Sequence, residues 1–184
     1  MKLTTPRLVL RELRQDDAAS IAKYVSDREI AKNLLVVPHP YSLKDAHEFL
    51  ARCAKYRKKR LREVYNLALE LTSERQLIGL VGLKGVDQFN GTGSLGYWLA
   101  QDYHRQGLMS EAVAAMIDFA FTELKLRRID VCAFSENRAS NGLIKKLGFT
   151  YEGKARKSLR DRATGAIHDE NRYGLLQNDW LKRK

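Results

Sequence analysis

The stretch QDYHRQGLMSEAV, residues 101–113, decides the fold that this sequence predicts. It follows the apolar run SLGYWLA (94–100) and opens an amphipathic helix that we expect over residues 108–124. RIDVCAF (128–134) comes next, a short and nearly apolar run that is typical of a strand buried on both faces. A strand, a helix and a strand in this order predict a βαβ unit with two parallel strands.

The turn inside this unit, just before the helix, has features that favour an anion. Free backbone N–H groups and the helix dipole meet at a helix N-terminus, where phosphate groups bind. Gly107 lets the backbone approach a ligand closely, and Arg105 adds a positive charge. A purely structural turn explains these residues equally well. Neither GxGxxG after a strand nor GxxxxGK[ST] occurs, which argues against the two common nucleotide folds.

The N-terminal side of this unit predicts a strand at residues 7–13 and a short helix at residues 14–27. Two prolines make residues 33–42 an irregular loop and a candidate lid. Ser42 then caps a long helix whose last part, RCAKYRKKRLR (52–62), carries seven basic residues. That basic end is either a solvated helix terminus, favoured by the dipole, or a surface that contacts RNA.

In the remaining segments the spacing of apolar residues changes between every second residue, which is typical of strands, and the helical repeat of about 3.6 residues. Two antiparallel strands are expected at residues 64–71 and 76–85, joined by a turn at residues 73–75. A second helix is expected over residues 136–149, stopping at Gly148. Strands at 150–160 and 170–177 complete an α+β arrangement, and no linker divides the chain into two domains.

Composition limits the function classes. The 184 residues carry 33 Lys and Arg against 22 Asp and Glu, a net charge of +11. Such an excess favours a polyanionic partner such as RNA, a ribosome or a phosphate-rich ligand, although a solubility charge with no partner explains it as well. The N-terminus lacks the shape of a signal peptide and no apolar run can span a bilayer, so we expect a cytoplasmic protein without membrane contact.

Cysteine and histidine usage predicts neither a disulfide nor a metal site. Cys53 and Cys132 lie in apolar-periodic runs, so we expect both to be buried and unpaired. The four histidines show no close metal-ligand spacing: His39, His47, His104 and His168.

The longer motifs carry a family resemblance. YHRQGLMSEAV, followed after a helix and a strand by SENRASNGLIKKLGFTYEG, resembles the GNAT acyltransferases and, within them, the RimJ/RimL-type N-acetyltransferases. PRLVLREL, PHPY with SLKDAHEFL, IGLVGL and LGYWLA extend the resemblance over residues 6–180. It implies the GNAT acyl-CoA N-acyltransferase fold as one domain over residues 1–184: a mixed, mostly antiparallel sheet with a central splayed parallel pair and flanking helices.

The resemblance also implies how the acyl donor, acetyl-CoA, is held. Its pantetheine arm would lie between the splayed strands near Trp98 and Leu99, with Asn137 beside it. Lys145 would reach the phosphates, although a solvated helix face explains this lysine equally well. The pyrophosphate would bind the turn formed by His104, Arg105, Gln106, Gly107, Leu108, Met109 and Ser110.

Two positions depart from the family's general loop pattern, Gln/Arg-x-x-Gly-x-Gly/Ala. His104 and Met109 occupy its first and last slots. Because the expected phosphate contacts are mainly backbone N–H groups, the departures leave donor binding intact and remove one side-chain contact at position 104.

The catalytic assignments follow from the resemblance. Asn137 and Ser140 match the family's Asn-x-x-Ser, with Ser140 as the proton donor to the leaving thiolate, while helix capping is the structural alternative. Asp169 matches an acidic residue of this branch and is the candidate base, with a structural salt bridge as its alternative. Glu170, Glu70, a water chain and a route without a base stay open.

The acceptor is the least determined part. The resemblance implies a primary amine, with the N-terminal α-amine of a ribosomal protein as the first candidate and proximity to ribosome or RNA as a consequence. A polyamine is disfavoured, since a protein at +11 repels it. A detoxifying or metabolic acetyltransferase of small amines and a catalytically silent RNA-associated module are the alternatives, and a homodimer is one option for assembly.

Overall fold

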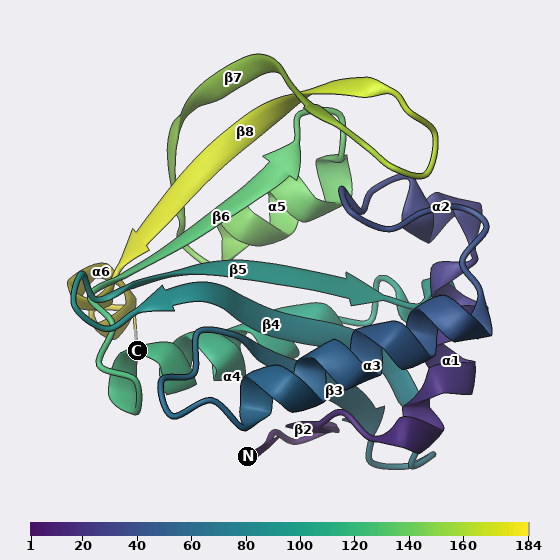
Figure 1. Cartoon of the computed structure of the whole chain (residues 1–184). Helices are drawn as coiled ribbons and strands as arrows, with labels where there is room; N and C mark the ends of the chain where they lie inside the picture. Colours follow the sequence, from purple (N-terminus) through teal and green to yellow (C-terminus); the bar gives the residue numbers. More distant parts are fainter. Residues whose placement is uncertain (184) are drawn as a thin grey trace.

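An eight-stranded sheet runs through the computed structural model, which describes residues 1–183. Its strand order is β1-β2-β3-β4-β5-β6-β8-β7, so only the last two strands leave chain order (Figure 1). The strands are β1 (Lys2–Thr4), β2 (Leu8–Glu12), β3 (Tyr65–Leu71), β4 (Leu77–Asp87), β5 (Thr92–Leu99), β6 (Arg128–Phe134), β7 (Thr150–Arg160) and β8 (Ile167–Leu176).

Helices flank this sheet, and two single 3-10 turns precede two of them. The α-helices are α1 (Ala18–Val25), α2 (Arg28–Ala31), α3 (Leu43–Arg57), α4 (Leu108–Thr122), α5 (Arg138–Lys146) and α6 (Gln177–Leu181). The 3-10 turns are η1 (Gln15–Asp17) and η2 (Gln101–Tyr103). Each of these described helices is too short or too polar to cross a lipid bilayer.

The two faces of the sheet pack against different helices because strand side chains alternate. Leu67 and Leu69 of β3 belong to the large apolar cluster that includes α4 and α5. Ala68, between them, joins a second cluster made with α1 and α3. Figure 1 shows α3 crossing β3 and β4 on the near side, with α4 and α5 behind the sheet. We call these the α3 face and the α4 face.

The predicted βαβ unit is confirmed, and its parallel strands separate partway along. β5 and β6 are paired from Thr92↔Arg128 to Leu95↔Val131 and no further. Beyond that point residues 96–99 pair with β4 only, and residues 132–134 pair with β8 only. The carboxyl ends of the two strands therefore diverge, as Figure 1 shows, and within residues 1–183 each presents an edge without a strand partner.

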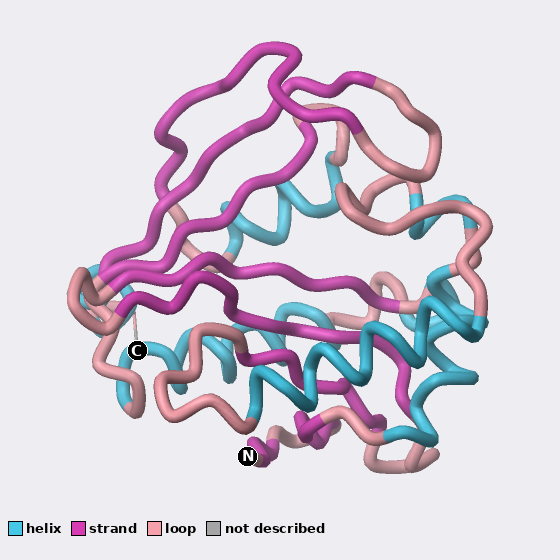
Figure 2. The backbone as a smooth tube through the Cα atoms, in the orientation of Figure 1, coloured by secondary structure: helices cyan, strands magenta, loops and turns pink. Residues whose placement is uncertain are grey.

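Strand β6 is not buried on both faces as its apolar sequence predicts. Ile129, Val131 and Ala133 are buried toward the α4 face, whereas Cys132 on the other face is exposed. The reason is that, in residues 1–183, no helix covers β6, β8 and β7 on the α3 face (Figure 2). The expectation that both cysteines are buried is therefore wrong for Cys132, and Cys53 is only half-buried.

The basic helix end is shorter than predicted. Helix α3 stops at Arg57, and residues 58–64 form a loop. Arg62 is not a free surface cation: its guanidinium lies 2.7 Å from Glu12 and 4.3 Å from the Tyr65 ring centre. Repulsion among successive cations and these two contacts explain why the chain leaves the helix before Arg62.

Candidate active site

The turn before α4 has the backbone of an anion-binding loop. Gly107 is the N-cap of α4 with φ of +77°, and Arg105 is also left-handed with φ of +60°. No side chain among the described residues caps this helix. The N–H groups of Leu108, Met109 and Ser110 therefore lie in a first helical turn that supplies them with no carbonyl acceptor. Donors of this kind and the helix dipole fit a pyrophosphate.

An ion pair across 104 residues of sequence holds this turn in place. The backbone N–H and the Nε of Arg7 donate to the Glu111 carboxylate at 2.9 and 2.8 Å. One terminal nitrogen of Arg7 donates to the Gln106 carbonyl at 2.8 Å. Burial opposes the charge of Glu111, but hydrogen bonds from Thr5 and Arg7 outweigh it and lower the pKa of this carboxyl. Sequence reasoning missed Arg7 and Glu111, since no local pattern joins positions so far apart.

Two side chains of the turn face the protein. The His104 Nε2 hydrogen-bonds the Leu99 carbonyl at 2.9 Å, and the Gln106 side-chain amide donates to the Asp102 carbonyl at 3.1 Å. The first contact joins the turn to the end of β5, and the second closes the turn onto η2. Contacts of the His104 and Gln106 side chains with phosphate stay a prediction. The backbone of these two residues is part of the turn.

A hydrogen bond spans the gap between the diverging strands. The Tyr97 hydroxyl of β5 lies 2.9 Å from the Ser140 hydroxyl of α5. Burial raises the pKa of Tyr97 to about 12, so the phenol stays protonated at neutral pH. The two hydroxyls form a hydrogen-bonded pair at the open end of the splay. Tyr97 was missed in the sequence, because inside SLGYWLA it is indistinguishable from an ordinary core residue of a strand.

Asn137 caps α5, which is the structural role that the sequence left open for it. Its side-chain oxygen accepts the Ser140 backbone N–H at 3.0 Å. Asn141, which sequence reasoning did not single out, anchors the helix: its amide donates to the Phe134 and Asn137 carbonyls, and its oxygen accepts from Asn171 and Tyr173. The start of α5 is thereby fixed beside β6 and β8, which holds Ser140 near Tyr97.

Two candidate bases have structural partners. Asp169 accepts the backbone N–H of Lys157 at 2.8 Å, at an irregularity between β7 and β8. Glu70 accepts from Arg11 at 2.5 Å, and Arg11 also pairs with buried Asp17. A base role stays a prediction for both carboxylates. Lys145, on the last turn of α5, is exposed, and its contact with the donor stays a prediction too.

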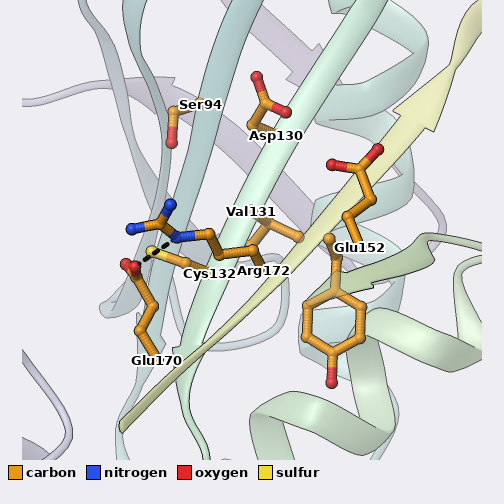
Figure 3. Close-up of a pocket in the computed structure, with 8 residues that line it drawn as sticks. Ser94, Asp130, Val131, Cys132, Glu152, Glu170 and Arg172 are labelled. Carbon is orange, nitrogen blue, oxygen red and sulfur yellow. Dashed lines mark hydrogen bonds and ion pairs between the residues drawn. The ribbon is translucent and has the colours of Figure 1, made fainter. Parts of the chain in front are cut away.

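On the α3 face a shallow hollow of about 240 Å³ opens between β5, β6 and β8. Its lining includes three carboxylates and one thiol (Figure 3): Asp130, Glu152, Glu170 and Cys132. Although part of Cys132 is exposed, the protein around its thiol displaces water, and this desolvation first, then hydrogen bonding with Glu170, raises the pKa of the thiol to about 11. This thiol is neutral at physiological pH and is a poor nucleophile there.

A histidine between two carboxylates ties the β7–β8 loop to the start of α5. His168 contacts Glu136 through Nδ1 and Asp161 through Nε2, the latter at 2.9 Å. The ring also stacks on Phe134, with ring centres 4.1 Å apart. Burial opposes the imidazolium, but the hydrogen bonds to Asp161 and Glu136 outweigh it and raise the pKa of His168.

This raised pKa predicts a pH-dependent stability. The stabilisation is complete below the unfolded-state pKa of about 6.5 and is lost as pH rises through the higher folded-state value. The His168 contribution to the free energy of unfolding should therefore fall as pH rises above about 6.5. Urea unfolding at several pH values should show this loss in the wild type and in the exposed-histidine control His47→Gln, but not in His168→Gln. Parallel pH curves for all three proteins would contradict the assignment.

The fold and the site define an acyl-CoA-dependent acyltransferase: a splayed parallel pair, a helix N-terminus whose first N–H groups have no acceptor within the helix, and a hydrogen-bonded hydroxyl pair at the open end of the splay. The acetyltransferase (GNAT) domain model matches residues 7–150, and the chain belongs to this family. Acetyl-CoA is its acyl donor, and the enzyme is an N-acetyltransferase.

Relatives match over nearly the whole chain. An N-acetyltransferase of Bacillus licheniformis, p20, is 30% identical and covers 97% of both chains. The ribosomal protein uS5 alanine N-acetyltransferase of Escherichia coli is 26% identical over 98% of this chain and 93% of its own. A crystal structure of the microcin C7 self-immunity acetyltransferase MccE with acetyl-CoA and AMP shares the fold, with a TM-score of 0.78 at 19% identity over 94% and 93% of the chains.

Proposed function

We propose that this enzyme transfers the acetyl group of acetyl-CoA to the N-terminal α-amine of a protein, with ribosomal proteins as the first candidates. The observation that carries the transfer step is the Tyr97–Ser140 hydrogen bond across the open end of the splay. The unpaired edge of β5 offers backbone groups to the donor on one side of this gap. The name of the Escherichia coli relative supports the choice of acceptor.

In this proposal the residues of the chain divide the work. The α4 N-terminus holds the phosphates, and backbone N–H groups of β5 polarise the thioester carbonyl. Ser140 gives its proton to the leaving thiolate, and Tyr97, protonated at neutral pH, supports it by hydrogen bonding. Asn137 orients Ser140 by capping α5.

A panel of acceptors tests the proposal. Peptides with the N-terminal sequences of ribosomal proteins, free amino acids, small amines and polyamines are incubated with acetyl-CoA, and intact-mass spectrometry detects added acetyl groups. We expect acetylation of at least one peptide at its α-amine. Acetylation of only free small amines would favour the alternative, a metabolic or detoxifying acetyltransferase. Polyamines belong in the panel, because the carboxylates of the α3-face hollow oppose the net charge locally.

Binding near the ribosome is tested separately, through the exposed basic residues at the end of α3. Replacing four of them with glutamine should weaken co-sedimentation with ribosomes and reduce its salt dependence, because fewer phosphates are neutralised. Acetyl-CoA affinity should be unchanged. The four, all exposed, are Arg57, Lys58, Lys59 and Arg60.

A charge-matched control separates this surface from net charge alone. The same number of glutamines is placed on exposed basic positions of β7: Lys154, Arg156, Lys157 and Arg160. Sedimentation at two salt concentrations compares both variants with the wild type. If the α3 variant sediments like the wild type at both, the basic residues are an ordinary solvated surface.

A further inference from the structure

The hollow on the α3 face differs from its surroundings in charge. Asp130, Glu152 and Glu170 line it together with Arg172, on a chain whose net charge is +11. Arg128 neutralises two of these carboxylates, since it pairs with Asp130 and, at 2.6 Å, with Glu152. Their side chains are 45% and 41% exposed, whereas that of Glu170 is only 10% exposed. Glu170 is therefore the one buried carboxylate among the residues that line the hollow.

Strand register places Glu170 at the open end of the splay. It lies opposite Phe134 in the β6–β8 pairing, beyond Val131, where β5 and β6 last pair. Cys132 and Arg172 are opposite each other in this pairing and line the hollow together (Figure 3). Their neighbours Val131 and Tyr173 pack into the cluster of the α4 face, so alternation directs Cys132 and Arg172 to the other face of the sheet. Tyr97, in contrast, packs into the cluster of the α4 face. The gap between the strands therefore has a hydroxyl pair on one face and a buried carboxylate on the other.

We infer that Glu170 binds the ammonium form of the acceptor amine and takes a proton from it. The inference rests on the proposed function, because it needs the acyl donor on the α4 face, where the α4 N-terminus lies. An acceptor that meets the thioester from the opposite side of the sheet then passes the hollow. Its positive charge is recognised by a carboxylate whose side chain is only 10% exposed, and this burial strengthens the attraction between opposite charges.

The contacts of Glu170 leave room for this role. The Nε of Arg172 donates to Oε2 at 2.8 Å, and the Cys132 thiol is the second neighbour. A carboxylate accepts about four hydrogen bonds, so an ammonium is accommodated beside both. Arg172 orients the carboxylate through its hydrogen bond, while the neutral thiol does not compete for the acyl group.

The proton balance of the step is complete. Glu170 takes one proton from the ammonium and releases it to solvent. The nitrogen lone pair of the neutral amine attacks the thioester carbonyl, a C–N bond forms and the C–S bond breaks. The second nitrogen proton passes to solvent, and the thiolate takes up a proton, through Ser140, to give the CoA thiol. The products are the N-acetyl amide, CoA and one proton.

Glu170→Gln tests the inference, with Glu152→Gln as the matched control from the same hollow. The probe is a short peptide with a free N-terminal alanine, and kcat/KM for this peptide is measured across pH. We expect Glu170→Gln to lower it by ~10²-fold, the lower end of the range for a general base, and to remove its rise with pH. Glu152→Gln should stay near wild type, and calorimetry should show unchanged CoA affinity for both.

A conservative variant keeps the test independent of folding. Glu170→Asp retains the carboxylate and should recover part of the rate together with the pH dependence. Wild-type kinetics in Glu170→Gln, or equal losses in Glu170→Gln and Glu152→Gln, would overturn the role of Glu170 while the proposed function stands. Absence of peptide acetylation by the wild-type enzyme instead contradicts the proposed function. With small-amine probes the same variants then report on Glu170 alone.

Discussion

Replacing Ser140 with alanine is expected to slow acetyl transfer by roughly 10²-fold or more, the range for removing a general acid. The hydroxyl of Ser140 reaches Tyr97 across the gap between β5 and β6, where the leaving thiolate forms in our proposal. The alanine variant keeps the backbone N–H that Asn137 caps, so α5 should be retained. Rapid-quench measurement of the transfer step, with KM for acetyl-CoA measured separately, should place the loss in kcat.

Tyr97→Phe is the companion variant to Ser140→Ala. It removes the partner hydroxyl and keeps the buried ring, so packing at the splay is preserved. We expect a smaller loss of kcat than for Ser140→Ala, because the serine still donates. A turnover of Ser140→Ala within a small factor of wild type would make Ser140 only a residue of the helix.

The second large effect concerns donor binding by the turn before α4. Gly107→Val should weaken CoA binding by about 1–3 kcal/mol, the range for leaving buried polar groups unpaired. At φ of +77° a β-branched residue is strongly disfavoured, so the turn should shift and lose the alignment of its N–H groups. Isothermal titration with CoA measures the change directly.

A strain-matched control accompanies Gly107→Val. Gly91, between β4 and β5, has φ of +61°, and Gly91→Val imposes comparable backbone strain away from the turn. It should lower stability without changing CoA affinity. Unchanged CoA affinity in folded Gly107→Val would show that the turn does not hold the pyrophosphate.

Local patterns were enough to predict the βαβ unit. The helix expected over residues 108–124 is observed as Leu108–Thr122, because its apolar spacing and the preceding glycine are both local features. The capping role of Asn137, which the sequence offered as an alternative, follows from similar short-range chemistry. The parallel pairing of β5 with β6 follows from the helical crossover that joins the two strands.

What could not be predicted depends on contacts between distant segments. An apolar run such as RIDVCAF shows that one face packs well, but not whether any helix covers the other, so the exposure of Cys132 was missed. The pairing of Arg7 with Glu111 and of Tyr97 with Ser140 likewise depends on tertiary geometry. Among the carboxylates considered as bases, only burial distinguished Glu170, and burial is not encoded locally.

The point at which β5 and β6 stop pairing is also absent from any local pattern. Both strands continue with apolar residues past Leu95 and Val131, and only the backbone pairing reveals the divergence. The account of catalysis rests on this gap, since it brings the α4 N-terminus, the hydroxyl pair and the buried carboxylate to one place.

A crystal structure of the enzyme with CoA tests this arrangement most directly. We expect the pyrophosphate on the N–H groups of the turn at residues 105–110, the pantetheine arm between β5 and β6, and the sulfur beside the Ser140 hydroxyl. The hollow with Glu170 should remain open on the opposite face. A cofactor bound elsewhere, with its sulfur away from the Tyr97–Ser140 pair, would contradict the account.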